Sequence, residues 1–569
     1  MNNQIFWIVL KRLRIPFLVI IVTFTISIIG MVLIPGVTSN GKPYHFSFFD
    51  AFYFVSYMAT TIGFGEEPYA FTYPQRIWVS FSIYLTVIGW FYGIGTIISL
   101  IQDNALRKAI SKNRFTKQIQ YLSQKFIIIL GYNNITKSII EHINSQDLRT
   151  VVLDKDEIKI DQLILNNFFP NVPAFVGQAT DQQMLKMAGI NHKNCIGIVS
   201  LFENDIQNLK IATICRMLNK KIDIIVKSTS RQHTQLLLDM GLRHIQNPFD
   251  IISKRLYYGI IAPHIWLLEM WVYGNTLQLR HKDSFPKGKY IIFGKGRMGQ
   301  AIIDGLNLAD IQYTLYDATS QEYAQNKQSM VFGDTDDIKT LTDLGVTSAA
   351  CIIAATRDDL FNLTVLKQAK ILNPNIFTIA RENSLEDTSI FQVSRIDKVF
   401  INEKILADIT YNFLSRPLAT YFIQEIRKQN EAWAEKLVAN MKEMISATAG
   451  YFELQVNLDE TYALWLRLDN REAITLKDIL RLRENRNSHS PVICLLALRN
   501  GATHLLPNLD FDIQKNDKLL FAANTEAFED LLYITNNIYE LDYILNKNTL
   551  HPNWLFSKVF QSSKDKTAS

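Results

Sequence analysis

Cysteine is scarce in this sequence of 569 residues, which contains only four. They lie far apart in apolar or helical contexts, with neither CxxC pairs nor the spacing of metal ligands: Cys195, Cys215, Cys351 and Cys494. We therefore expect reduced thiols inside the fold. The pattern argues against a zinc or an iron–sulfur centre.

The chain also carries little excess charge. It has 59 basic and 54 acidic residues, which gives a net charge of +5. The basic surplus follows one apolar segment and does not form a stripe along the chain. The sequence therefore predicts no nucleic-acid partner.

Charged residues are absent from two long apolar stretches, 15–35 and 77–101. A helix needs roughly 20 residues to cross a bilayer, so each stretch is predicted to span the membrane. By the positive-inside bias, both termini are expected in the cytoplasm of a multi-pass protein of the bacterial inner membrane. The basic residues behind this orientation are Lys11, Arg12 and Arg14 before the first stretch, and Arg107, Lys108, Lys112, Arg114 and Lys117 after the second.

Between the two stretches lies the segment TIGFG. Glycines at alternate positions permit backbone conformations that side chains forbid, and carbonyl oxygens along a narrow tube can replace the water around a K⁺ ion. The aromatic residues 48–59 before it are too few to cross a membrane and suit a re-entrant pore helix whose C-terminal end faces the cation. The alternative, an ordinary glycine turn, is disfavoured by the flanking spans. The predicted selectivity filter consists of Thr61, Ile62, Gly63, Phe64 and Gly65.

A filter made from a ring of carbonyl oxygens requires several chains around one axis. Two spans and one loop cannot enclose a pore alone, so a homotetramer in the lipid bilayer is predicted. Three glycines inside the second span indicate either a gating hinge or a face that packs closely against another helix. They are Gly89, Gly93 and Gly95.

The rest of the chain contains an internal repeat. An apolar run ending in glycine is followed 23 residues later by an aspartate at the end of a second run, in both copies. Continuous apolar runs separated by segments of helical length are typical of doubly wound parallel sheets, so two Rossmann-like α/β domains are predicted. The matching positions are Gly131, Asp154, Gly177, Gly189 and Cys195 in the first copy, and Gly294, Asp317, Gly333, Gly345 and Cys351 in the second.

The second copy carries a complete GxGxxG motif between a strand and a helix. Its glycines allow a tight turn, approach of a pyrophosphate and close helix packing, while Asp317 can accept hydrogen bonds from ribose hydroxyls. This pattern predicts a site for NAD or an adenine nucleotide, with a purely structural turn as the alternative. The candidate residues are Gly294, Lys295, Gly296, Arg297, Met298, Gly299 and Asp317, with Asp334, Thr356, Arg357 and Arg381 at the ends of later strands.

In the first copy only the first glycine of the motif is present. Gly131 and Asp154 are weaker nucleotide candidates, because Tyr132 and the two asparagines that follow it would crowd a pyrophosphate. A scaffold role is the alternative for this loop.

With filter, spans and tandem domains together, the chain resembles prokaryotic two-transmembrane potassium channels that carry regulator-of-K⁺-conductance (RCK) domains. The stretch from Pro68 to Trp90 resembles the branch with both RCK copies on one polypeptide, which responds to nucleotides and divalent ions. The resemblance implies eight RCK units per tetramer in a cytoplasmic gating ring. It also implies K⁺ as the permeant ion and a nucleotide as the regulatory ligand.

One difference from calcium-gated relatives concerns the cation ligands. Where those relatives have carboxylates, this chain has Ser200, Lys227 and Thr229 in the first copy, and Arg381 in the second. Because a hard cation needs several oxygen ligands, we expect no calcium site of that type. The sequence predicts no metal other than K⁺ in the filter and leaves a divalent ion elsewhere open.

Rossmann motifs also occur in enzymes. An oxidoreductase needs an acid–base residue beside the nicotinamide, and the ten histidines of this chain are dispersed. We therefore expect no enzymatic activity. The alternatives are a membrane-anchored NAD-dependent oxidoreductase and an RCK-type regulatory subunit of a K⁺ transporter.

These features set the expected domain boundaries. The prediction is a pore domain over 1–105, a linker over 106–122, a first RCK domain over 123–275, and a second with its connecting helices over 287–448. A small α+β lobe is expected over 449–540, with a hairpin turning at Asn500 and Gly501, and a tail over 541–569.

Overall fold

The computed structural model describes residues 2–143, 148–274, 278–279, 284–317, 330–331, 338–383 and 388–546. The chain divides into two compact units. One consists of Met1–Leu122 with Met187–Gly189, and the other of Ser123–Lys186 with Ile190–Ser569. Each unit has its own architecture.

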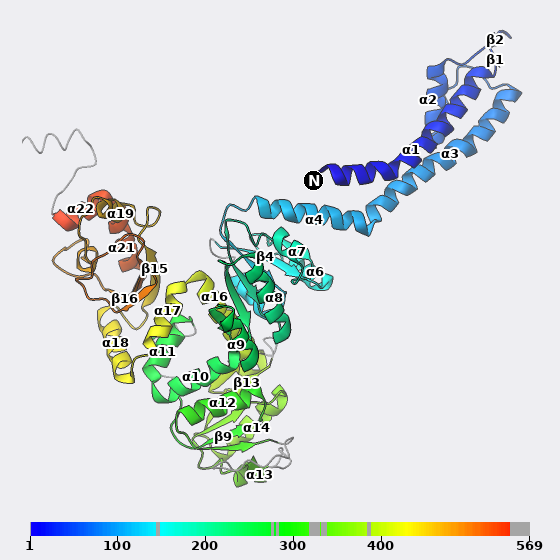
Figure 1. The fold of residues 1–569 in the computed structure, drawn as a ribbon. Coiled ribbons are helices and arrows are strands. Elements are labelled where there is room, and N and C mark those ends of the chain that lie inside the picture. The colour runs from blue at the N-terminus through cyan, green and yellow to red at the C-terminus, as the bar shows by residue number, and fades with distance from the viewer. Residues whose placement is uncertain are drawn as a thin grey trace, which may run out of the picture. The chain divides into compact units, whose positions relative to one another are not determined.

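The first unit is built on two long helices that lie side by side (Figure 1). They are α1 (Asn2–Leu33) and α3 (Tyr73–Gln102), and the segments Leu10–Leu33 and Tyr73–Gln102 are long and apolar enough to cross a membrane. Gly30 allows their close approach, because a Cβ atom there would lie 1.9 Å from the indole ring of Trp78. The Trp78 indole N–H donates to the carbonyl of Ser27 at 3.1 Å, which fixes the ring between the helices.

Three smaller elements complete this unit. The short helix α2 (Phe48–Ala59) packs against both long helices, and β1 (Gly36–Val37) pairs with β2 (Pro43–Tyr44) in the connection that precedes it. Helix α4 (Asn104–Gln120) follows α3 and begins at Asp103, whose carboxylate accepts from the amides of the first turn. The segment 106–122, expected as a linker, is therefore mostly helical.

The second unit contains two six-stranded parallel sheets of the same topology, which confirms the predicted tandem Rossmann-like fold. Their strand orders are β5-β4-β3-β6-β7-β8 and β11-β10-β9-β12-β13-β14. All side chains of the central strands β3 and β9 are buried, as the continuous apolar runs require. The bounds are β3 (Phe126–Leu130), β4 (Arg149–Asp154), β5 (Ala174–Val176), β6 (Cys195–Ser200), β7 (Asp223–Lys227) and β8 (His244–Gln246) in the first copy, and β9 (Tyr290–Phe293), β10 (Tyr313–Tyr316), β11 (Met330–Val331), β12 (Cys351–Ala354), β13 (Phe377–Glu382) and β14 (Lys398–Ile401) in the second.

Helices cover both faces of each sheet. Those of the first copy are α5 (Asn134–Ile143), α6 (Glu157–Leu165), α7 (Gln182–Met187), α8 (Asp205–Leu218) and α9 (Arg231–Asp239). Those of the second copy are α12 (Arg297–Leu308), α13 (Ile338–Asp343), α14 (Asp359–Leu372) and α15 (Thr388–Val393).

The two copies exchange helices. Helix α10 (Pro248–Ile261) follows the first sheet but packs on α12 of the second copy, and α16 (Asn402–Ser415) follows the second sheet but packs on α5 of the first. This exchange joins the hydrophobic cores and brings the carboxyl-end loops of the two sheets into contact. The connection continues through α11 (Pro263–Val272), α17 (Pro417–Ile426) and α18 (Glu431–Met444).

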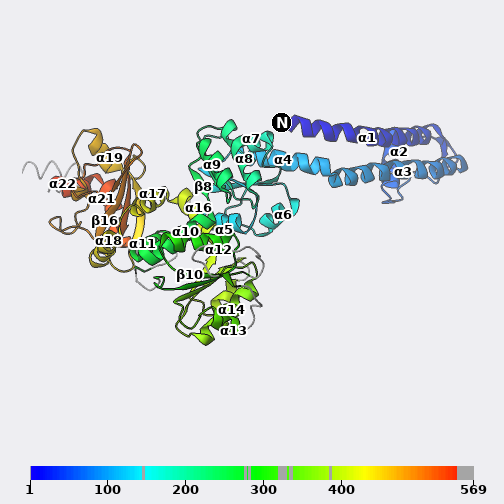
Figure 2. The same ribbon diagram turned by 60° about the horizontal axis from the view of Figure 1, so that its bottom comes forward.

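The C-terminal lobe is an antiparallel sheet with helices on both faces (Figure 2), which confirms the predicted α+β module. Helices α11, α17 and α18 cover one face, and the lobe's own helices cover the other. The predicted hairpin is confirmed, because Asn500 and Gly501 take positive φ angles of 49° and 84° between paired strands. The elements are β15 (Gly450–Gln455), α19 (Tyr462–Asp469), α20 (Leu476–Ile479), β16 (Val492–Arg499), β17 (Ala502–Leu505), β18 (Lys518–Ala523), α21 (Thr525–Asn536) and α22 (Ile538–Asn546).

Candidate functional site

The backbone of the candidate filter alternates in handedness. Thr61, Gly63 and Gly65 have φ angles of 61°, 66° and 70°, whereas Ile62 and Phe64 between them do not take positive φ. Such alternation turns successive carbonyl oxygens toward one side of the segment. Thr61 is β-branched, so its left-handed conformation is strained, and strain of this kind is typical of functional segments.

The filter segment is attached to α2 through the backbone. The amides of Ile62 and Gly63 donate to the carbonyl of Tyr57 at 3.0 and 3.3 Å, and the Tyr57 hydroxyl donates to the carbonyl of Glu66 at 3.2 Å. These bonds fix both ends of the segment. They place the C-terminal end of α2, where the helix dipole is negative, next to its start.

The glycines of the second apolar helix differ in their surroundings. A Cβ atom at Gly89 would lie 2.7 Å from the Thr23 hydroxyl, and one at Gly93 would lie 2.5 Å from the Ile20 side chain. Both therefore allow close packing against α1. A Cβ atom at Gly95 would meet nothing within 4 Å, and α3 is helical through all three positions. The packing interpretation thus explains Gly89 and Gly93, and the hinge prediction rests on Gly95.

The glycine-rich loop of the second copy has the geometry that its motif predicts. Gly294 takes a φ of 98° at the end of β9, and the amide of Lys295 donates to the Asp317 carboxylate at the end of β10. A Cβ atom at Gly299 would lie 1.8 Å from the Gly294 carbonyl oxygen, so only glycine fits there. A Cβ atom at Gly296, which caps α12, would face open space. The loop is therefore closely packed at Gly299 and has open space at Gly296, and Met298 is buried in the core.

Three arginines lie at this edge of the second sheet. Burial, with Arg357 and Arg297 nearby, lowers the pKa of Arg381, and Asp359 offsets only part of the effect. The buried Arg381 Nε has no hydrogen-bond partner in the described part of the chain. Because an arginine stays protonated in a protein, such an edge favours an anion.

Buried asparagines brace the strand ends of both copies. Asn362 donates to the carbonyls of Thr356 and Arg381 at 3.2 and 3.1 Å and accepts from the Thr356 amide at 3.1 Å. The Thr356 hydroxyl also donates to Asn362, at 2.6 Å, so this candidate is part of the brace. Asn208 makes the same contacts in the first copy, with Phe202 and Lys227. Lys227 therefore corresponds to Arg381, and Glu203 corresponds to Arg357. The candidate Asp334 lies outside the described residues.

The corresponding edge of the first copy is filled by its own side chains. Gly131 keeps a φ of 92° and the Tyr132 amide donates to Asp154 at 2.7 Å, as in the second copy. The Phe202 ring covers the loop, because a Cβ atom at Gly131 would lie 2.6 Å from it. The buried Tyr132 hydroxyl accepts from Asn166 at 2.6 Å. This loop has the Rossmann geometry without the open space.

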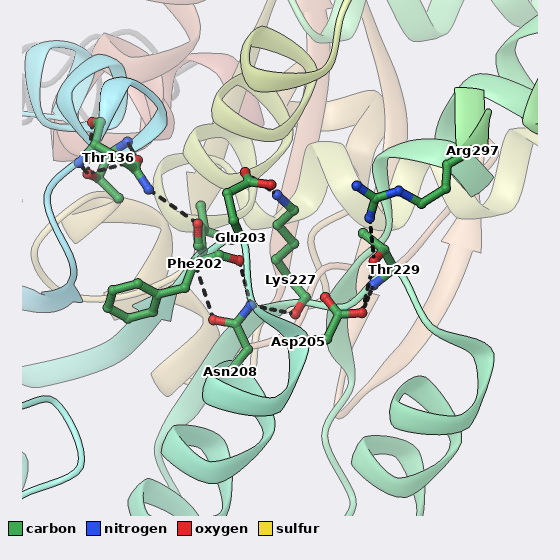
Figure 3. A network of polar contacts seen from close by, with 10 residues as sticks. Thr136, Phe202, Glu203, Asp205, Asn208, Lys227, Thr229 and Arg297 are labelled. Carbon is green, nitrogen blue, oxygen red and sulfur yellow. Dashed lines mark hydrogen bonds and ion pairs between the residues drawn. The ribbon is translucent and has the colours of Figure 1, made fainter. Parts of the chain in front are cut away.

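Its charge is also neutralised internally. The Lys227 ammonium lies 2.6 Å from the Glu203 carboxylate, and Figure 3 shows the two side chains pointing toward each other. Lys227 is almost fully buried, so this pair satisfies a basic group that an anion could have used. Sequence motifs do not identify Phe202 and Glu203, because no sequence signal marks residues that fill or neutralise a site. They are identified by their structural correspondence with Thr356 and Arg357.

Comparisons with known proteins agree with this geometry. Residues 127–248 and 290–402 match the TrkA-N domain. An uncharacterized protein of Methanothermus fervidus is 24% identical over 247 residues, which cover 43% of this chain and 36% of that protein. Potassium channel protein 1 of Methanocaldococcus jannaschii is 25% identical over 255 residues, covering 45% of this chain and 72% of the relative. The solved GsuK channel bound to NAD is 16% identical, covers 93% of this chain and 98% of its own, and gives a TM-score of 0.48.

The TrkA-N match and the potassium-channel relative confirm the resemblance to potassium channels with RCK domains that the sequence predicts. The matches cover about a third of the first relative, so they establish domains rather than the activity of the whole chain. The apolar helices and the potassium-channel relative together support a membrane location. Two segments that match the TrkA-N domain thus follow each other in a chain with two helices that are long and apolar enough to cross a membrane.

Proposed function

We propose that this chain forms a K⁺-selective channel whose opening is controlled by a nucleotide bound to the second RCK copy. The observation that carries the proposal is the alternating left-handed backbone at Thr61, Gly63 and Gly65. Carbonyl oxygens turned to one side of a segment can replace the hydration shell of a dehydrated K⁺ ion. The M. jannaschii relative, described as a potassium channel protein, supports this ion.

The filter determines how many chains the channel needs. One segment supplies one wall of a pore, so four chains around a common axis would form the channel as a homotetramer. In this arrangement α2 and the filter re-enter the bilayer between the spans of α1 and α3. Both termini then lie in the cytoplasm of the cell, where the RCK copies meet the nucleotide pool.

The nucleotide would bind at the open edge of the second sheet. Its phosphates would lie against the start of α12 and near Arg297, Arg357 and Arg381, whose positive charge Asp359 offsets only in part. Asp317 would accept from the ribose hydroxyls of NAD or an adenine nucleotide. The ligand would shift the pore toward whichever state binds it more tightly.

The test is K⁺ flux into liposomes that contain the purified chain, with Na⁺ as the competing ion, with and without NAD or ADP. We expect selective K⁺ flux that changes with nucleotide. Gly63→Ala and Gly65→Ala should abolish flux or its selectivity, because alanine is strained at positive φ. Gly41→Ala is the matched control, since Gly41 has a φ of 74° with open space around it, outside the filter.

Each of three outcomes would contradict a different part of the proposal. Full selectivity in both filter variants would refute the filter. Selective flux that ignores nucleotide would refute the regulatory half alone. Consumption of nucleotide without ion flux would favour the oxidoreductase alternative.

A further inference from the structure

Arg297 belongs to the nucleotide loop of the second copy, yet its side chain contacts the first copy. Its guanidinium Nη1 donates to the Thr229 hydroxyl at 3.1 Å, and Figure 3 shows the arginine reaching this residue from α12. The guanidinium also lies over the Phe249 ring, 5.1 Å from its centre. A side chain in the phosphate-binding loop is thus held by residues from outside its own domain.

Thr229 is itself fixed in place. One oxygen of Asp205 accepts from the Thr229 amide at 2.8 Å, from the Thr229 hydroxyl at 2.9 Å and from the Ser230 amide at 2.8 Å. Because the Thr229 hydroxyl donates to Asp205, its lone pair is turned toward Arg297. The contact therefore has one orientation.

The contact uses one end of the guanidinium. Within the described residues, Nε and Nη2 of Arg297 make no hydrogen bond, while Arg381 lies near enough to repel the group. An arginine without Thr229 and Phe249 would move away from this positive edge. Ligand binding would then include the free-energy cost of bringing it back.

We propose that Thr229, held by Asp205, is a positioning residue for the nucleotide bound by the second copy. It holds Arg297 beside the glycine-rich loop with Nε and Nη2 available to a phosphate group of the ligand. The site of the second copy is therefore complete only when the first copy is docked against it. This inference rests on the proposed nucleotide function, and it makes nucleotide affinity depend on the arrangement of the two copies.

The experiment measures the affinity of the purified full-length chain for NAD and for ADP by titration calorimetry at low salt. Thr229→Val keeps the shape and removes the hydroxyl, so we expect about tenfold weaker binding. Thr229→Ser keeps the hydroxyl and should bind like the unmodified chain. Thr213→Val is the matched control, because the Thr213 hydroxyl bonds the Leu209 carbonyl within α8, away from the loop.

Arg297→Gln supplies the second arm. It should weaken binding by at least as much, because a charge-assisted bond to phosphate is lost. Adding Thr229→Val to Arg297→Gln should then cost nothing further, since Thr229 acts through Arg297.

The outcomes separate the inference from the function beneath it. Weaker binding in Arg297→Gln with unchanged binding in Thr229→Val would overturn the positioning role and leave the nucleotide site intact. Tighter binding in Thr229→Val would also overturn it, because Thr229 would then compete with the ligand for Arg297. Equal losses in the valine and serine variants would show a general structural defect and overturn it as well. Absence of binding by the unmodified chain would refute the nucleotide site and the inference together.

Discussion

Glu269 offers the sharpest test of what joins the helices between the domains. Its carboxylate, on α11, is 0% exposed and accepts from Arg255 of α10 at 3.2 Å and from Arg427, which follows α17, at 2.7 Å. Burial opposes the charge, but the two arginines hold the pKa of Glu269 below its usual range. One carboxylate thus compensates two guanidinium groups whose side chains are 4% and 21% exposed.

Removing the carboxylate leaves both charges without their partner. Breaking a buried ion pair from one side costs about 3–5 kcal/mol, so we expect Glu269→Ala to destabilise this region by that amount. A triple replacement, Arg255→Met with Glu269→Leu and Arg427→Met, removes every buried charge and should cost much less. The contrast separates loss of packing from uncompensated charge.

Hydrogen exchange of α10, α11 and α17 in the purified chain is the suitable assay, because a chain of several domains does not unfold in one step. Glu472→Ala is the control: the Glu472 side chain is 38% exposed and its partner Arg467 retains a second carboxylate, Asp542, so the cost should stay below about 1 kcal/mol. Because folding lowers the pKa of Glu269, the stabilisation that its carboxylate gives to the folded state is present above about pH 4.3. It is lost as the pH falls through the folded pKa. Two results would refute this reasoning. The stability of Glu269→Ala could lie within about 1 kcal/mol of that of the unmodified chain, or the triple variant could be less stable than Glu269→Ala.

Three further predictions concern other parts of the chain. Burial raises the pKa of Glu453 from 4.5 to about 7, so its contribution to stability is lost as the pH rises through this range; Glu453→Gln should remove this slope, worth about 3 kcal/mol, in hydrogen exchange of β15. Gly299→Ala should abolish nucleotide binding measured by calorimetry, because its Cβ would lie 1.8 Å from the backbone oxygen of Gly294. Gly30→Ala should destabilise the pair of α1 and α3 by about 1–3 kcal/mol, measured by hydrogen exchange of the two helices, because the Trp78 ring occupies that space.

The sequence predicts those parts of the fold that depend on local composition. Apolar runs free of charge mark α1 and α3, because the lipid bilayer is the environment that tolerates so much exposed apolar surface. Apolar runs also mark β3 and β9, which are buried on both faces, and the loop after β9 is predictable because each glycine answers a backbone constraint. The hairpin at Asn500 and Gly501 follows from turn chemistry alone.

The rest depends on residues far apart in the chain. Arg297 and Thr229 lie 68 positions apart and meet only because the copies exchange α10 and α16. The sequence predicts only a linker over 106–122, whereas helix α4 fills most of this segment, with Asp103 capping its first turn. The role of Gly89 and Gly93 required knowledge of which face of α3 meets α1.

The two RCK copies share one scaffold and differ in a few residues at the same sheet edge. Asn208 and Asn362 fix the same strand ends, so the difference arises from what the braced loops carry. In the first copy Glu203 neutralises Lys227, and Phe202 fills the space above Gly131. In the second copy the position of Glu203 is held by Arg357, which reverses the charge and leaves the edge open. The clustered arginines reduce stability although Asp359 offsets part of the repulsion, and such a cost persists in a folded protein where a function requires it. If a phosphate-bearing ligand binds at the open edge of the second copy, as proposed, it would offset this positive charge and lower the free energy of that domain.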